Sequence, residues 1–479
     1  MDRKEDNRLT IQQYLNERGF DTIDNSFYSQ IEQWAQWYQG KVKEFHSYRA
    51  YNGRTNVSCE RLSLQMAKKV CEDWANLLMN EKVAITIDGQ KEQHFIDEVL
   101  KNNNFIVKAN EAQELKAAYG TVAYVPYMAN VEVKKDSGKV IKGNKELSCI
   151  HINYIAGDCI FPLSWENGII KECAFGSRKT VEGKEYFYLQ LHMLEKGMYV
   201  IENVLFDDTN GQMLEVAINS IKGFETIAPK IYTQKNTPQF VIDKMNIVNN
   251  IDKNNPMGIA VFANSIDILK AIDIVFDSYN NEFLLGRKRI MVAEEALHMD
   301  TEGKMTFDPT DMAFYRLPEG IENENFIHEI DMSLRANEHE IALQNRLQLL
   351  SAKSGFGENH YKFDQGGIAT ATQVISENSY LFRTLKKHEI ILENALKELV
   401  KILLLMGNQY LSLGLNEQAE TVIDFDDSII EDRQTKLNDM RLDVSAGLLK
   451  PEYYIAQKYN VTLQEAIKLL PDEEAIQEY

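Results

Sequence analysis

In the first part of the chain, apolar residues recur at helical spacing. Large apolar side chains appear every three or four residues between Ser26 and Gly40, and the glycine ends the run, which predicts a helix. A later amphipathic run passes into the alternating segment VAITI, closed by Asp88 and Gly89, which predicts a strand. The polar stretch up to about Asn25 is expected to be mobile. The predicted elements here are helices over 26–40, 62–79 and 92–102, and a strand over 83–87.

Short alternating runs separated by turn signals fill the chain from about Tyr119 to Ile231. No long helical pattern interrupts them, so an antiparallel module of α+β type fits this part best. Asp136, Ser137 and Gly138 are expected to form the turn of a hairpin. The predicted strands include 121–127, 131–133, 139–142, 185–193 and 199–203.

A long helix is predicted after the breaker cluster at 254–258. It would run from about Asn264 to Arg289 and reach about 39 Å. Its wide apolar surface needs neighbours on several sides, which either a ring of copies or an ordinary core would supply. One stripe is apolar and consists of Phe262, Ile266, Leu269, Ile272, Phe276, Tyr279 and Phe283. A narrow polar stripe consists of Asp267, Lys270, Asp273, Asp277 and Asn281.

A small insertion separates this helix from a returning one. Turn signals and short strand patterns occupy residues 290–330, and helical spacing resumes over 332–353. The Gly-rich loop 354–367 follows. Thr370 then begins a capping box, T-A-T-Q, that opens the longest predicted helix. A strand over 421–425 and an acidic helical tail complete an α+β chain.

Composition adds a constraint on nucleic-acid binding. The chain has 479 residues, 44% hydrophobic and 26% charged, which is typical of an ordered protein with more than one module. Its formal net charge of −20 argues against a general nucleic-acid coat, because nonspecific DNA affinity depends on Lys and Arg. An acidic bore would still let a duplex slide without sticking. The simpler interpretation is that the acidity keeps the chain soluble.

The cysteines and the longest apolar runs indicate in which cellular compartment the protein is made. The five cysteines form no CxxC pair and their number is odd, which fits a reducing environment. The charged N-terminal residues contain no secretory core. Among the longest apolar runs is Ile402–Met406, far shorter than the roughly 20 residues of a membrane span. We therefore expect a protein made in the cytosol and not inserted in a membrane.

No complete catalytic motif is found in the sequence. The segment 138–145, GKVIKGNK, lacks the Gly-Lys-Ser/Thr end of a phosphate-binding loop, and no HExxH, GxSxG or zinc-ligand cluster is found. An acidic group near the C-terminus has two interpretations. It would hold magnesium in a metal-dependent nuclease, or it marks a strand end followed by a helix N-terminus, where carboxylates are favoured. The group consists of Asp424, Asp426, Asp427, Glu431 and Asp432.

Two basic groups are candidate contacts for a phosphate backbone. Arg287, Lys288 and Arg289 form the densest basic group, although cations at a helix C-terminus are also favoured by the helix dipole. In and beside the Gly-rich loop lie three further basic residues and one aromatic residue. An exposed loop of this kind either contacts phosphates or only connects two helices. These loop residues are Lys353, His360, Tyr361 and Lys362.

Four segments carry a family resemblance. They are WYQG at 37–40, AKKVCEDWANLLMNEKVAI at 67–85, GGIATATQVISENSYLFRTLKKHE at 366–389 and FDDSIIEDRQ at 425–434. Together they resemble the portal proteins of tailed bacteriophages, and specifically the Gp6-like family of siphophages that infect Gram-positive bacteria. They occur in the family's order along nearly the whole chain, and the most specific is 366–389, which resembles the helix after the tunnel loop.

The resemblance implies a portal architecture and no cofactor. Lys353, His360 and Lys362 would face DNA, an assignment that rests only on their position in the loop. Because this tunnel loop is not strongly basic, passive passage of DNA is favoured over clamping of DNA. The implied domains are a wing over 1–255, stem helices over 256–290 and 331–353, a clip over 291–330, a tunnel loop over 354–369, and a long wing helix and crown over 370–479.

The implied function is structural. A dodecameric ring would occupy one capsid vertex of the virion, after assembly in the host cytoplasm. Double-stranded DNA would pass through its bore. The implied partners are terminase, head-completion or adaptor proteins, scaffold and the major capsid protein. Two alternatives remain open, a metal-dependent nuclease or terminase-like enzyme that uses Asp426, and another minor capsid protein.

Overall fold

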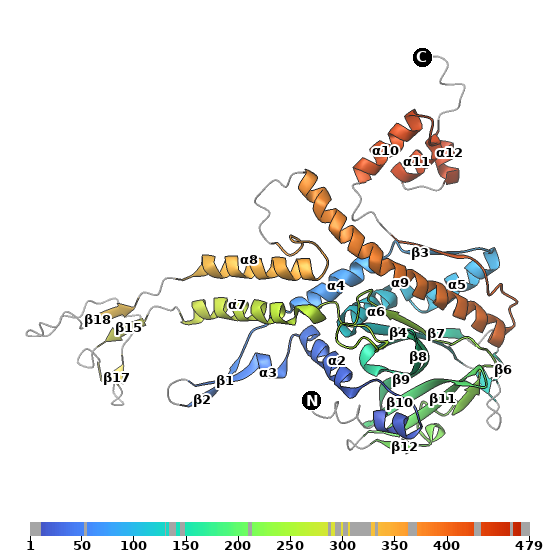
Figure 1. Cartoon of the computed structure of the whole chain (residues 1–479), viewed down its shortest axis with the longest axis horizontal. Coiled ribbons are helices and arrows are strands. Elements are labelled where there is room, and N and C mark those ends of the chain that lie inside the picture. Colours follow the sequence, from blue (N-terminus) through green and yellow to red (C-terminus); the bar gives the residue numbers. More distant parts are fainter. Residues whose placement is uncertain are drawn as a thin grey trace, which may run out of the picture.

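The described part of the chain is a mixed α and β body from which a pair of helices projects (Figure 1). The computed structural model describes residues 11–51, 55–129, 131–133, 140–143, 149–208, 213–285, 289–292, 298–299, 305–306, 327–330, 334–362, 371–425, 433–459 and 463–470. Within these ranges, every helix is too short or too polar to cross a bilayer.

The N-terminal residues are packed from residue 11 onward. Residues 11–17 are helical, and Ile11, Leu15 and Ile23 are buried in the main hydrophobic core. The prediction of a mobile stretch up to Asn25 is therefore wrong for these residues. The spacing of Ile11 and Leu15 gives the short helix one apolar face, and burial of that face offsets the entropy of ordering the segment.

The first helices of the body are α2 (Asn25–Tyr38), α3 (Lys43–His46), α4 (Met66–Leu78), α5 (Gln90–Asn102) and α6 (Phe105–Tyr119). Of these, α2, α4 and α5 agree with the prediction apart from their ends, and α3 and α6 were not predicted. α2 begins where the Asp24 carboxylate accepts the Ser26 N–H at 2.7 Å, an N-cap. It ends just before Gly40, whose φ of 71° favours glycine. α4 begins at Met66 because Gln65 has a left-handed backbone that cannot continue a helix.

α6 was not predicted, because its buried positions lie on several sides and give no single apolar face. They include small alanines and also two polar residues, Gln113 and Lys116. The Lys116 ammonium lies 3.1 and 3.2 Å from the two carboxylate oxygens of Asp243, and both side chains are fully excluded from solvent. Gln113 donates a further hydrogen bond to the same carboxylate at 2.9 Å. Burial lowers the pKa of Lys116, and the Asp243 charge opposes that change.

Strands fill the region from 119 to 231, as predicted. The strands of the chain are β1 (Ser47–Tyr51), β2 (Asn56–Glu60), β3 (Ala84–Ile87), β4 (Thr121–Ala129), β5 (Val131–Val133), β6 (Val140–Gly143), β7 (Cys149–Ala156), β8 (Ile160–Glu166), β9 (Ile169–Val181), β10 (Lys184–Glu195), β11 (Met198–Asp207), β12 (Leu214–Val216), β13 (Lys230–Tyr232), β14 (Val241–Lys244), β15 (Arg289–Val292), β16 (His298–Met299), β17 (Met305–Thr306), β18 (Ile327–Ile330) and β19 (Thr421–Asp424).

These strands pair antiparallel in separate sheets. The largest has the order β12-β11-β10-β9-β8, and β13 also pairs with β11. A second has the order β14-β4-β7, and this places Asp243 on β14 beside α6. β3 pairs with β19, so two predicted strands from opposite ends of the chain meet. β1 and β2 form a hairpin that was not predicted.

Two helices run side by side away from the body (Figure 1). They are α7 (Ile266–Leu285), after a 3-10 turn at Ala263–Ser265, and α8 (Ala336–Lys353). At their far end β15 pairs with β18, and β16 with β17. α7 ends at Leu285 and Arg289 opens β15, so the prediction of a helix up to Arg289 is wrong. A glycine follows Leu285 in the sequence and commonly ends helices, and the 20 residues of α7 span about 30 Å.

The longest helix of the described residues crosses the body after the Gly-rich loop. α9 (Ala371–Leu411) has 41 residues and begins directly after Thr370, as the capping box predicted; Thr370 itself lies outside the described residues. Its buried leucines join the main core. The C-terminal helices are α10 (Arg433–Ser445), α11 (Pro451–Tyr459) and α12 (Leu463–Leu469).

Candidate functional site

The chain leaves α8 through a loop that is held against α4. The Trp74 indole N–H on α4 donates to the Ser354 carbonyl at 2.9 Å. The Trp74 ring stacks on Phe356, with centroids 4.9 Å apart. Phe356 in turn stacks on His360 at 4.4 Å. These aromatic contacts fix the first part of the Gly-rich loop on the body, and we call residues 354–362 the anchored segment.

The Asp73 carboxylate binds the end of the anchored segment. Tyr361 donates its hydroxyl to Asp73 Oδ2 at 3.0 Å, and His360 Nε2 lies 3.3 Å from the same oxygen. Burial raises the pKa of the Asp73 carboxyl, but hydrogen bonds from His360, Lys69 and Tyr361 outweigh it and hold the pKa below its usual value. Burial and the Asp73 charge raise the pKa of Tyr361, so the phenol stays protonated and can donate.

Glycine is required where this segment passes closest to the body. Gly355 has a φ of +91°, a conformation that other residues adopt only with strain. A Cβ at this position would lie 2.8 Å from the Thr384 methyl group and 3.1 Å from the Trp74 ring. The glycine therefore allows the chain to lie between α4 and α9.

The four loop residues singled out from the sequence have two different environments. Tyr361 is buried at 8% exposure, and its hydroxyl is engaged by Asp73. Lys353 and Lys362 are exposed at the two ends of the loop's described part, and neither forms an ion pair with another described residue. His360 is partly exposed and lies beside Asp73. The structure therefore brings His360 and Tyr361 together and leaves both lysines facing solvent.

Two of the three residues of the other basic group, Arg287 and Lys288, lie outside the described residues. Arg289 is the first residue of β15 and pairs in register with Ile330 of β18. Because Arg289 lies in a strand and not at the end of a helix, the helix dipole does not explain a cation at this position.

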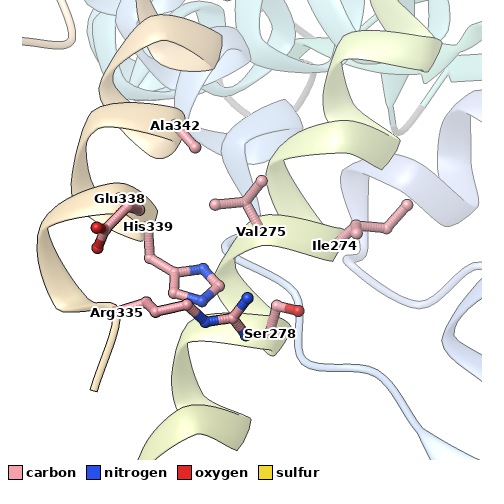
Figure 2. A pocket seen from close by; sticks show the side chains of 7 residues that line it. All are labelled: Ile274, Val275, Ser278, Arg335, Glu338, His339 and Ala342. Atoms are coloured by element: carbon pink, nitrogen blue, oxygen red, sulfur yellow. The ribbon is translucent and has the colours of Figure 1, made fainter. Parts of the chain in front are cut away.

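A polar cluster joins α7 and α8 near their far end. Glu282 of α7 accepts a hydrogen bond from Arg335 Nε at 2.8 Å, and His339 Nε2 lies 3.5 Å from the same oxygen. The hydrogen bond from Arg335 lowers the pKa of Glu282. Figure 2 shows an open pocket between the two helices beside this cluster. Its lining residues are Ile274, Val275, Ser278, Arg335, Glu338, His339 and Ala342.

The opposite side of α7 binds the chain that leads into α4. Asp273 is buried at 3% exposure and accepts hydrogen bonds from the Leu64 N–H at 2.8 Å and the Ser63 hydroxyl at 3.0 Å. His46 Nε2 lies 3.0 Å from the same carboxylate. Asp277 accepts the Leu62 N–H at 3.0 Å. Two residues of the narrow polar stripe on α7, Asp273 and Asp277, therefore bind His46 and residues 62–64.

Asp73, Trp74 and Asp273 were missed as positioning residues. A charged residue in the middle of a strongly apolar helix indicates a buried polar contact, so Asp273 could have been singled out. Its partners could not, because they lie more than 200 positions earlier in the chain. Of the acidic group near the C-terminus, Asp424 ends β19 and the other four residues lie outside the described ones. Within the described ranges, no three His, Cys, Asp or Glu side chains lie close enough together to hold a metal ion.

We expect Tyr361→Phe to loosen the anchored segment without unfolding the body. The change removes one hydrogen bond to a charged, half-buried carboxylate and should lower the free energy of unfolding by about 1.5–3 kcal/mol. Amide hydrogen exchange in residues 354–362 should become faster. Tyr453→Phe, at a 46% exposed position on α11, is the matched control and should change neither quantity. Unchanged exchange in 354–362 would show that the Asp73 contact does not hold the segment.

Comparison with known proteins gives one match that covers nearly the whole chain. The family model described as phage portal protein, SPP1 Gp6-like, matches residues 20–479. A search of curated proteins found no match. Solved structures include the neck of a native gene transfer agent particle computed with C12 symmetry, with 11% identity, a TM-score of 0.41, and coverage of 81% of this chain and 88% of that one.

A second solved structure, the virion of a native gene transfer agent particle, has 10% identity and a TM-score of 0.40, with coverage of 82% of this chain and 89% of that one. Likenesses this distant carry no argument about this chain. The family match does, because it extends over all the segments whose resemblance was noted in the sequence. The chain belongs to the SPP1 Gp6-like family of phage portal proteins and is a structural portal protein.

Proposed function

We propose that copies of this chain close into a dodecameric ring at one capsid vertex, and that double-stranded DNA passes through the bore during packaging and ejection. Family membership supports this proposal. The observation on this chain that carries it is the pair α7 and α8, which projects from the body with large apolar side chains in water.

The apolar surface of this pair is larger than one copy can cover. Two helices share a single seam, so their other sides need further neighbours. Five large apolar side chains on the two helices are between 47% and 61% exposed. These side chains lie on more than one side of the pair, and a ring would cover them because it places another copy on each side. The five residues are Ile274, Phe283, Leu284, Ile341 and Leu349.

The proposed parts of the ring follow the predicted domains, and the two stem segments contain α7 and α8. We assign the wing to 1–255, the stem to 256–290 and 331–353, the clip to 291–330, the tunnel loop to 354–369, and the long wing helix and crown to 370–479. In this assignment Lys353, His360 and Lys362 lie closest to the DNA. The anchored segment holds the base of the tunnel loop at a fixed place on the wing.

The proposed role needs no cofactor and no catalysis. The ring would sit in the virion after assembly in the host cytoplasm. It would receive terminase during packaging and head-completion proteins afterwards, with scaffold and major capsid protein around it. DNA would slide past an acidic chain that repels phosphates.

The proposal is tested by electron microscopy and mass determination on the same purified sample. We expect closed rings with a mass of twelve chains and a bore wider than a DNA duplex, roughly 20 Å. A protein that stays monomeric both alone and when co-expressed with its scaffold would overturn the proposal.

Charge reversal in the loop should affect DNA and not assembly. Lys362→Glu adds a negative charge where the DNA is proposed to pass, so packaged DNA per particle should fall while ring formation stays normal. Lys196→Glu, in an exposed turn between β10 and β11, carries the same charge change away from the loop. Equal packaging by both variants would remove Lys362 from the DNA path.

A further inference from the structure

The β1–β2 hairpin extends from the body without being covered by it. None of the residues of the two strands is buried, and Tyr51 at the end of β1 is 69% exposed. An isolated two-stranded hairpin is only marginally stable in water. Its own chain half-buries Tyr48, Ala50 and Cys59 on one face, so the opposite face, which carries Arg49 and Tyr51, is the one open to a second surface.

One face of the hairpin carries its most exposed large side chains. Arg49 pairs in register with Ser58 and Tyr51 with Asn56, so Arg49 and Tyr51 lie on the same face. Arg49 is exposed and forms no ion pair with another described residue. A tyrosine beside an unpaired arginine is the composition that protein interfaces favour.

The base of the hairpin is rigid, so its direction is set. The Arg61 N–H donates to the His46 carbonyl at 2.7 Å, and the Arg61 guanidinium donates to the Phe45 carbonyl at 2.6 Å and lies over the Tyr48 ring. His46 contacts Asp273 on α7. The hairpin therefore projects from the side of α7 that carries Asp273.

A complementary surface lies on the other side of the helix pair. Tyr279 and Glu282 contact α8 through His339, and at about 100° per residue they lie on the face of α7 opposite Asp273. Beyond this seam α8 presents the exposed side chains of Ile341 and Leu349. We call this the α8 surface, together with the pocket of Figure 2 at its edge.

The α8 surface carries acidic side chains that can pair with Arg49. Glu338 and Glu340 are exposed on α8, and neither forms an ion pair with another described residue. Glu338 also lines the pocket. These carboxylates lie close in sequence to exposed Ile341, so Arg49 and Tyr51 at the far part of the hairpin face have a charged and an apolar counterpart. Glu60 is on the same face, at the base of the hairpin opposite Ser47.

We propose that the β1–β2 hairpin of one copy docks on the α8 surface of the next copy. A closed ring requires two different, complementary faces on each subunit, and these two lie on opposite sides of α7. Tyr51 packs against Ile341 and the pocket, and Arg49 pairs with Glu338 or Glu340. The inference rests on the proposed ring and adds a specific contact to it.

The test is photo-crosslinking in assembled rings. A benzophenone amino acid replaces Tyr51, and chains of light and heavy isotopic composition are mixed before assembly so that links between copies can be recognised. We expect light–heavy links from position 51 to residues 334–353 or 266–285. The same probe at Ile169, 61% exposed on β9 of the large sheet, should give no link to those helices.

Charge exchange provides a second readout. Arg49→Glu should reduce the yield of rings, and the added changes Glu338→Arg and Glu340→Arg should restore part of it. Rings whose position 51 links elsewhere, or no rescue, would overturn the docking contact and leave the ring intact as a proposal. Absence of rings from the unmodified chain would overturn both.

Discussion

Replacement of Lys116 by methionine is expected to lower the free energy of unfolding by about 3–5 kcal/mol. Lys116 and Asp243 are both fully excluded from solvent, and the ammonium contacts both carboxylate oxygens. Methionine fills most of the same volume, so the loss comes mainly from a buried carboxylate whose countercharge is gone. Gln113 still donates to it but carries no charge.

Denaturant unfolding of Lys116→Met and its control measures this effect. Lys108→Met on the same helix is the matched control, because Lys108 pairs with Glu111 at 48% and 54% exposure and should contribute at most about 1 kcal/mol. Adding Asp243→Leu to Lys116→Met should recover much of the loss, since an apolar pair leaves no buried charge. Similar losses for Lys116→Met and Lys108→Met would contradict the role of burial.

Trp74→Ala should destabilise the chain by about 3–5 kcal/mol and release the anchored segment, residues 354–362, from the body. Trp74 is completely buried, stacks on Phe356, contacts His388 edge-on and donates to the Ser354 carbonyl. Burial also lowers the pKa of His388 to about 3, so that imidazole stays neutral against the ring. Removal of the indole opens a cavity and leaves a buried carbonyl without its donor.

Limited proteolysis and hydrogen exchange distinguish the local effect from the global one. In Trp74→Ala, the rate of amide hydrogen exchange in residues 354–362 should rise by a larger factor than the lower free energy of unfolding predicts for the whole chain. Trp165→Ala removes an indole that is only half-buried and bonded to the Asn254 carbonyl, so it should leave the loop unchanged. Equal exchange of the loop in both variants would contradict the anchoring role of Trp74.

Elements with one clear apolar stripe could be predicted from the sequence. α2 and α9 begin within one residue of the predicted positions, and the strand-rich region lies where turn signals placed it. α6 could not be predicted in this way, because alanines and a buried ion pair replace the stripe. The β1–β2 hairpin lacked a signal too, since no residue of it is buried and alternation along it is weak.

The candidate site was only partly predictable for a related reason. Exposed residues such as Lys353 and Lys362 are recognised by type and by their place beside glycines. The role of Tyr361 depends on Asp73, which lies 288 positions earlier. Helical spacing identified α4 but contains no information about which distant segment packs on it. The family resemblance, which the family match confirms, supplied the order of parts and not these contacts.

The polar stripe on α7 has a mechanical consequence. Asp273 binds the chain at Leu64, two positions before α4 begins, and Asp73 and Trp74 in the second half of α4 bind the loop. The part of α4 from Met66 to Trp74, about 12 Å long, thus connects the projecting helices rigidly to the base of the loop. A tilt of α7 would therefore move the base of the loop as well, because α4 connects the two.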